Sequence, residues 1–219
     1  MHTQAAPAIH QAPGAPGRLV PLTPQLSFPG FVMSFGRNEE IFGEEEPADF
    51  VYKVVSGAVR TTRFLSDGRR QIGAFHLPGD VFGQERGAAH RFSAEALTES
   101  QVVLIRRSAL DRAAEHDCAV ARELWSLTAR DLERIQDHML ILSRKNAAER
   151  VASFLLKLSE RTGSDSVALP MSRGDIADHL GLTIETVSRT LTQFERDGII
   201  DLPNTRRVIL KNRAALTSA

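Results

Sequence analysis

A seven-residue apolar repeat in the middle of the chain constrains the fold more than any other feature. A stripe with this period, sustained from Cys118 to Leu142, predicts one long helix that pairs with another helix. The alternative is an amphipathic helix that packs against its own domain. Charged residues flank the stripe and favour pairing with a second copy of the chain, which predicts a homodimer. The predicted dimer seam consists of Cys118, Ala121, Trp125, Thr128, Leu132, Ile135, Met139 and Leu142.

The segment before the repeat has the pattern of a β domain. Short runs rich in β-branched and aromatic residues predict strands at 50–55, 59–65, 71–77, 92–97 and 101–106, separated by turn residues such as Asp67-Gly68. Many short strands at near-regular spacing predict an antiparallel double-stranded β-roll, or jelly roll, over residues 30–110.

The first 29 residues are rich in Ala, Pro, Gln and Gly. They lack the basic and apolar regions of a secretory signal, so residues 1–29 are expected to form a flexible tail.

The segment after the repeat has helical patterns that end in a hairpin. The sequence predicts a dimerisation helix region over 111–145 and a separate domain over 146–219, which makes the fold α+β. Within 146–219, a helix, a short strand and two helices joined at Gly181 precede a β-hairpin over 199–211. This order predicts a winged helix-turn-helix. Ser172 is the expected N-cap of the first of the two joined helices, with Asp175 as its partner three residues on.

The second of these helices carries polar residues opposite its apolar face. Glu185, Ser188 and Arg189 fall on one side at helical spacing. Arginine can bond guanine O6 and N7 together, glutamate can accept from a cytosine amino group, and Ile184 can meet a thymine methyl. We therefore predict that Ile184, Glu185, Ser188 and Arg189 read DNA bases. The alternative is a solvated face with an ordinary ion pair between Glu185 and Arg189.

Phosphate contacts are expected from polar and basic residues around the two helices and the hairpin. The net charge is zero, so total charge does not favour a nucleic-acid partner, although the last fifteen residues are locally basic. The candidate phosphate contacts are Ser172, Arg173, Thr183, Thr186, Thr192, Arg206 and Arg207.

Composition excludes several classes of function. A single cysteine, Cys118, precludes an internal disulfide and favours a reducing, cytoplasmic compartment. No apolar run approaches the roughly 20 residues that span a bilayer, so no membrane partner is expected. The chain contains no nucleophile elbow, phosphate loop or zinc-binding helix, and an enzyme is not expected.

The residues from Gly181 to Arg189, with Phe194 and Gly198 to Ile200, resemble the Crp/Fnr family of bacterial transcription regulators, and its Fnr and FixK branch most. In that branch the recognition helix carries Glu-x-x-Ser-Arg. Gly57, the turn from Pro78 to Gly83, and Glu149 to Ala152 also match family motifs. The resemblance implies a cyclic-nucleotide-binding-like β-roll and Glu185, Ser188 and Arg189 as readers. It also implies a palindromic site like TTGA…TCAA and activation through RNA polymerase.

The effectors familiar in this family need residues that this chain lacks. An iron–sulfur cluster needs four thiolates, and only Cys118 is present. Cyclic-AMP binding uses a Gly-Glu pair and a downstream Arg-Ser, whereas this chain has Gly83-Gln84 and Phe92 before Ser93. Arg91 is one residue out of register, which points it to the opposite face of a strand. Haem would need an axial ligand, for which only His76 or His90 could be considered.

The resemblance therefore implies the FixK type, which regulates genes for low-oxygen respiration and nitrogen fixation, with no bound effector, cofactor or metal. Three alternatives remain. The first is a regulator gated by a cyclic nucleotide or another small ligand. The second is a β-roll interaction protein whose helix-turn-helix scaffolds a partner. The third is a jelly-roll metalloenzyme, which would need histidine companions for His76.

Overall fold

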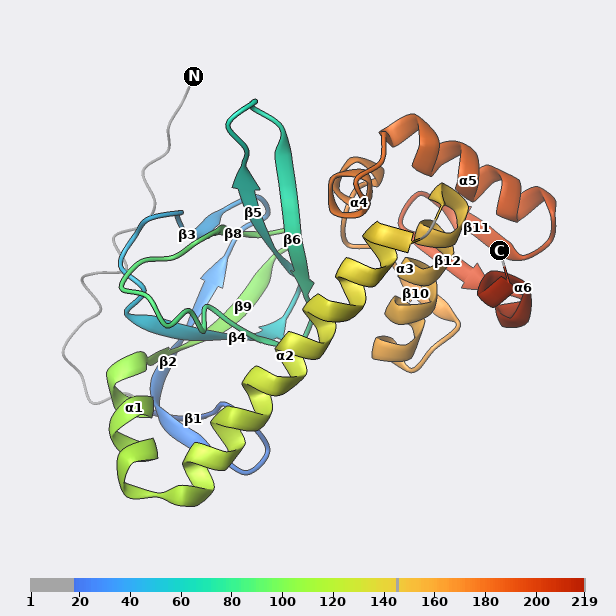
Figure 1. Cartoon of the computed structure of the whole chain (residues 1–219). Coiled ribbons are helices and arrows are strands. Elements are labelled where there is room, and N and C mark those ends of the chain that lie inside the picture. Colours follow the sequence, from blue (N-terminus) through green and yellow to red (C-terminus); the bar gives the residue numbers. More distant parts are fainter. Residues whose placement is uncertain (1–17, 145, 219) are drawn as a thin grey trace. The chain divides into compact units, whose positions relative to one another are not determined.

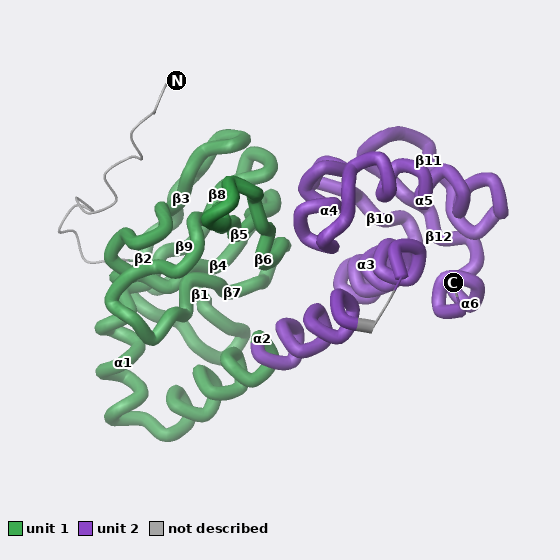
Figure 2. Tube along the Cα trace, turned by 45° about the horizontal axis from the view of Figure 1, so that its top comes forward, with its two compact units in different colours: residues 1–131 green, residues 132–219 purple. Residues whose placement is uncertain are grey.

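The computed structural model describes residues 18–144 and 146–218. The chain forms two compact units, which divide between Asp131 and Leu132, inside helix α2 (Figure 2). This division cuts through the region 111–145 that the sequence analysis treated as one segment. Within the described part of the chain, no helix is both long and apolar enough to cross a membrane.

Unit 1 contains two antiparallel sheets, which Figure 1 shows in blue to green. The five-stranded sheet has the order β1-β2-β9-β4-β7, and the four-stranded sheet has the order β3-β8-β5-β6. This arrangement confirms the predicted β-roll. The strands of the larger sheet are β1 Arg18–Pro21, β2 Ser27–Phe35, β4 Phe50–Ser56, β7 Val81–Phe82 and β9 Ser100–Arg106. Those of the smaller sheet are β3 Glu40–Phe42, β5 Val59–Phe64, β6 Arg70–His76 and β8 Ser93–Ala96.

Aromatic side chains fill the core formed by residues of both sheets. The ring of His90 stacks on Phe42 with 3.7 Å between centroids, and Tyr52 stacks on Phe82 at 5.3 Å. Burial of such rings is the main favourable term for a domain of this kind. Gly57 has a φ of +84°, and a Cβ there would collide with Ser100, so the turn between β4 and β5 requires glycine.

The other face of the five-stranded sheet packs against helices. Val51, Val103 and Ile105 form a second buried cluster with Leu110 of α1 and Val120 of α2. Helix α1 spans Arg107–His116, and α2 spans Cys118–Arg144 as one continuous helix, as the apolar repeat predicted. Helix α1 begins a few residues before the predicted boundary at 111.

The N-terminal boundary of the β-roll differs from the prediction. Strand β1 pairs with β2 from Arg18 opposite Gly30 to Pro21 opposite Ser27, and Val20 is buried. The flexible tail predicted over 1–29 is therefore wrong for residues 18–29, and residues 1–17 lie outside the described residues. Proline-rich composition was misleading here because β1 is an edge strand, where the missing N–H of proline costs no ladder hydrogen bond.

Unit 2 contains the second part of α2 and the predicted winged helix-turn-helix. A three-stranded sheet with the order β10-β12-β11 forms the wing. Val151, Leu155, Ile176, Leu191 and Val208 are buried in this unit. The elements after α2 are α3 Ala147–Thr162, β10 Ser166–Ala168, α4 Arg173–Leu180, α5 Ile184–Arg196, β11 Ile200–Asn204, β12 Arg207–Leu210 and α6 Arg213–Ser218.

Candidate nucleic-acid interface

Helix α4 starts and ends at residues whose local chemistry defines its limits. The backbone N–H of Asp175 donates to Ser172 Oγ across 3.0 Å, and the backbone N–H of Ser172 donates to Asp175 Oδ2 across 2.9 Å. This capping box satisfies amides that a helix start leaves without partners, and it confirms the predicted cap. Gly181 ends the helix with a φ of +62°, the left-handed conformation that glycine adopts readily.

Helix α5 is fixed by its apolar face and presents its polar face to solvent. Val187, Leu191 and Phe194 are buried, as the sequence predicted. Thr183 caps the helix by accepting from the N–H of Thr186 across 3.2 Å. The four predicted base readers lie in α5, and the first of them, Ile184, is the first residue of the helix. Ile184 is 49% exposed, Glu185 and Arg189 are exposed, and Ser188 is partly buried.

Glu185 and Arg189 do not pair with each other, although they lie four residues apart on α5. Within residues 18–144 and 146–218, neither side chain makes a hydrogen bond or an ion pair. The guanidinium donors and the carboxylate oxygens therefore remain available for a partner outside the chain. The structural ion pair, which was the alternative reading of this face, does not form.

The predicted phosphate contacts differ in how free their side chains are. Ser172 uses its hydroxyl in the capping box, and Thr192 donates its hydroxyl to the carbonyl oxygen of Ser188 across 3.0 Å. The hydroxyls of Thr183 and Thr186 lie 3.0 Å apart at the start of α5.

The basic candidates also differ. Arg206 donates to the carbonyl oxygen of Pro170 across 2.7 Å, so its guanidinium has a structural role. Arg207 is exposed at the start of β12, and Arg173 is partly buried at the start of α4. The seven candidates are therefore not equivalent, and Arg207 is the exposed arginine among them whose side chain has no hydrogen bond or ion pair within the described residues.

Arg150 holds the helix-turn-helix in place and was not among the predicted site residues. It lies in α3, and its guanidinium donates to the carbonyl oxygens of Leu180 and Leu142 across 3.0 and 2.8 Å. These carbonyls belong to the ends of α4 and α2. The only sequence signal was its place in the motif Glu149 to Ala152, which indicates a family and not a contact.

The predicted dimer seam is largely exposed in the single chain. Trp125 is 75% exposed, and Leu132, Ile135 and Met139 are each more than half exposed. Cys118 and Thr128 are also exposed, whereas Ala121 and Leu142 are partly buried. Val120 and Ile141, which lie outside the seam positions, are buried. One side of α2 therefore packs against other parts of the chain. The apolar stripe on its other side is not covered by the described residues.

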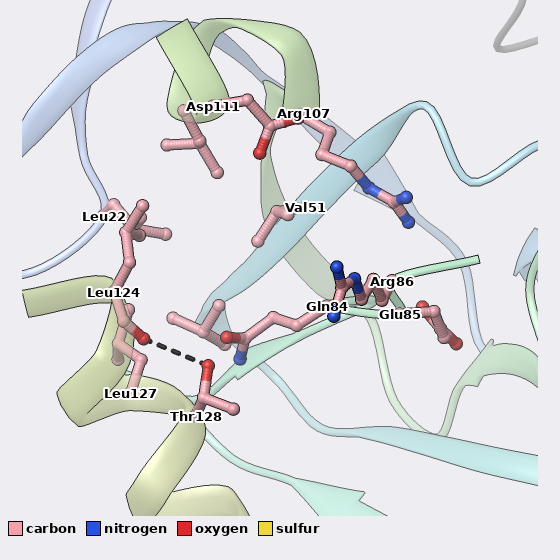
Figure 3. Close-up of a pocket in the computed structure, with 12 residues that line it drawn as sticks. Leu22, Val51, Gln84, Glu85, Arg86, Arg107, Asp111, Leu124, Leu127 and Thr128 are labelled. Atoms are coloured by element: carbon pink, nitrogen blue, oxygen red, sulfur yellow. Dashed lines mark hydrogen bonds between the residues drawn. The ribbon is translucent and has the colours of Figure 1, made fainter. Parts of the chain in front are cut away.

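A cavity of about 410 Å³ lies within unit 1, between the five-stranded sheet and the helices (Figure 3). Leu124, Leu127 and Thr128 of α2 line one side, and Gln84 reaches in from the loop after β7. By the resemblance to the family, Gln84 is the residue expected at the position of the glutamate of a nucleotide pocket. Arg107, which also lines the cavity, donates to the carbonyl oxygen of Gly87 across 2.7 Å.

The residues around Ser93 are arranged differently from a nucleotide site. Ser93 Oγ accepts from the backbone N–H of Glu44 across 2.9 Å, so this hydroxyl has a structural partner. The ring of Phe92 lies against Gly73, and Arg91 is exposed. The hydroxyl of Ser93 is therefore already engaged within unit 1, and Arg91 faces solvent.

The two histidines considered as ligands both lie in unit 1 and are buried. His90 Nδ1 lies 3.1 Å from Glu85 Oε2. Burial, the largest single contribution, raises the pKa of Glu85, but the hydrogen bonds to His90 and to the backbone, together with the charge of His90, lower it by more in total, so the pKa lies below its ordinary value. His76 stacks on Phe82 at 4.8 Å. Among the described residues, no group of three or more His, Cys, Asp or Glu side chains is placed to hold a metal ion.

Two domain families match the chain. Residues 32–117 match the cyclic nucleotide-binding domain, and residues 149–219 match the Crp-like helix-turn-helix domain. The first match covers the β-roll from residue 32 onward and α1, and the second begins within α3 and continues to residue 219.

The chain is also similar to three characterised regulators. The nitrogen fixation regulation protein FixK of Azorhizobium caulinodans is 54% identical over 188 residues, which are 83% of this chain and 76% of that protein. FixK of Rhizobium meliloti is 43% identical over 195 residues, which are 88% of this chain and 89% of that protein. The structure of FixK2 from Bradyrhizobium japonicum superposes with a TM-score of 0.83 at 54% identity, covering 86% of this chain and 96% of that one. The capped helix-turn-helix, the β-roll and these relatives together show that the chain belongs to the Crp/Fnr family of DNA-binding transcription regulators, in its FixK-type branch.

Proposed function

We propose that this regulator is a homodimeric activator that reads a palindromic site of the TTGA…TCAA type without a bound effector. Its expected targets are genes of low-oxygen respiration or nitrogen fixation, by analogy with the FixK relatives. Its expected compartment is the cytoplasm, where it meets DNA and RNA polymerase. The observation that carries the proposal is the exposed pair Glu185 and Arg189, without partners in the described chain, on a helix that is capped and buried on its other side.

Each reader has an assigned contact. Arg189 donates two hydrogen bonds to guanine O6 and N7, and Glu185 accepts from a cytosine amino group. Ser188, between them in sequence, bonds a base edge or a phosphate, and Ile184 meets a thymine methyl. Arg207 in the wing contacts phosphate, which contributes affinity and salt dependence but little sequence preference.

The exposed apolar stripe on α2 supports the proposed dimer. Large apolar side chains such as Trp125 and Ile135, repeated along one face of a helix, are stabilised when a second copy covers them. A twofold dimer presents two α5 helices to half-sites about one helical turn apart, roughly 34 Å. Two-fold symmetry of the protein then requires dyad symmetry in the operator.

Independence from an effector is supported by Gln84 and Phe92 at positions where the family's nucleotide site needs acidic and basic groups. A second function, gating by a small ligand, is favoured by the cavity of about 410 Å³ in unit 1. Titration of the purified protein with cyclic AMP during operator binding separates the two proposals. Affinity that requires the nucleotide would favour the gated regulator.

The proposed function is tested by selection of bound sites from random duplex DNA. The native chain should enrich a site with dyad symmetry and a conserved guanine in each half. The variant Arg189→Ala should enrich sites in which that guanine is relaxed. The matched control is Arg196→Ala, which removes an exposed arginine from the last turn of the same helix. Sites without dyad symmetry, or an equal effect of both variants, would contradict the proposal.

A further inference from the structure

Two histidines of unit 2 stack face to face where α2 meets α4. The rings of His138, in α2, and His179, in α4, are 4.0 Å apart between centroids and only 12° from parallel. Phe154 of α3 lies against His179 edge-on, with 6.0 Å between centroids. Both histidines are partly buried, so protons can reach them while the neighbouring helices hold them. The stack therefore lies at a junction of three helices.

The same junction holds the ends of two helices in place. Arg150 of α3 bonds the carbonyl oxygens of Leu142 in α2 and Leu180 in α4. Leu180 is the last residue of α4, and the reading helix α5 begins shortly after it, at Ile184. A shift of α4 against α2 would therefore move the start of α5.

Burial and one nearby cation disfavour a proton on His138. Lys157 of α3 is the cation that acts on it, and Lys157 is itself paired with Asp137 of α2 across 2.9 Å. Burial first and the charge of Lys157 second lower the pKa of His138 below its ordinary 6.5, and a hydrogen bond to the main chain of His179 works in the opposite direction. Other charged residues of these three helices, each with an interaction of its own, include Arg134 on α2, Arg150 on α3, and Asp175 and Asp178 on α4.

We propose that the stack of His138 and His179 is a proton-sensitive positioning contact, which fixes α4 against α2 while His138 is neutral. A proton on His138 adds a positive charge beside Lys157 and removes the favourable stack. Since the folded chain holds the pKa of His138 below 6.5, the contact has its full strength above about pH 6.5. It weakens as the pH falls from that value through the lower pKa of the folded state.

The first test needs no DNA, so that it does not depend on the proposed function. The His138 ring signal in a proton NMR titration of the full chain should have a midpoint below 6.5. Hydrogen-exchange protection factors of the α4 amides should fall more between pH 7.5 and 5.5 in the native chain than in His138→Gln. Glutamine stays neutral and keeps an amide that can bond the main chain. The control variant is His116→Gln, at an exposed position of α1 in unit 1. It should show the same change in α4 protection as the native chain.

A midpoint at or above 6.5 for His138 would overturn the inference without any variant. The inference would also be overturned if the protection of the α4 amides changed with pH to the same extent in His138→Gln and in the native chain. The reciprocal variant, His179→Gln, should also reduce the change with pH in the protection of the α4 amides.

The second test measures the consequence for DNA and rests on the proposed function. With the selected operator, the native affinity should fall more than that of His138→Gln over the same pH range. If the α4 protection changes while the difference in affinity is absent, the positioning role is overturned. A native chain that shows no sequence preference at pH 7.5 contradicts the proposed function instead and leaves the α4 result as it stands.

Discussion

The guanidinium of Arg150 donates to the carbonyl oxygen of Leu180 across 3.0 Å. The bond joins α3 to the last residue of the first helix of the helix-turn-helix, where carbonyl oxygens have no partner within the helix. A second bond from the same side chain reaches Leu142 near the end of α2. One side chain therefore couples α2 to the helix-turn-helix.

Replacement of Arg150 by lysine should destabilise the helix-turn-helix unit by about 1.5–3 kcal/mol, because a single ammonium does not reproduce the two bonds of a planar guanidinium. Urea unfolding followed by hydrogen exchange of the α4 amides measures the change. Arg196→Lys, on the exposed last turn of α5, should change stability by less than about 0.5 kcal/mol. Equal stability of Arg150→Lys and the native chain would show that the two bonds contribute little.

Replacement of Arg189 by alanine should weaken operator binding by about 1–3 kcal/mol and relax the preference at one guanine per half-site. Thermal unfolding should not change, because the side chain is exposed and has no partner in the described chain. Fluorescence anisotropy with the operator and with a duplex altered at that guanine measures both effects. A uniform loss on the two duplexes would assign Arg189 to phosphate and not to a base.

Replacement of Ser172 by alanine should cost about 0.5–2 kcal/mol of stability, because the N–H of Asp175 loses its acceptor. The measurement is urea unfolding of the full chain. Ser108→Ala, at an exposed position of α1, is the matched control and should be neutral. If Ser172→Ala is as stable as the control, the capping box does not determine the start of α4.

Replacement of Ile135 by aspartate should shift the chain from dimer to monomer, because a carboxylate on the seam has no partner when the second copy covers it. Sedimentation velocity over a range of protein concentrations measures the change. Phe64→Asp, at a residue of β5 that is 65% exposed, is the control and should remain dimeric. Operator affinity should fall with dimerisation. A monomeric native chain would contradict the proposed dimer directly.

The helix-turn-helix could be predicted residue by residue because its determinants are local. A cap at Ser172, a glycine turn at Gly181 and an apolar spacing through Val187 act within a few residues of one another, and the structure has each of them where the sequence placed it. The β-roll could be predicted in outline but not at its edge. Strand β1 depends on pairing with β2, and a proline-rich composition concealed it.

The candidate readers were also predicted from spacing, but their availability was not. Glu185 and Arg189 four residues apart are equally compatible with an ion pair, and only the placed side chains show that they leave each other free. Leu142 is a similar case. The repeat assigned it to the seam, whereas in the structure it is partly buried and lies near the turn at Gly181.

By itself, the sequence determined the long helix, the order of the two kinds of domain and the chemistry of the reading face, because periodicity and short spacing act along the chain. Only the tertiary structure decided that Arg150 joins α2 to α4 and that His138 stacks on His179. Those contacts join residues from helices that are separate in sequence, and their geometry arises when apolar burial brings the helices together. The physical distinction is between interactions that the local backbone imposes and interactions that packing creates.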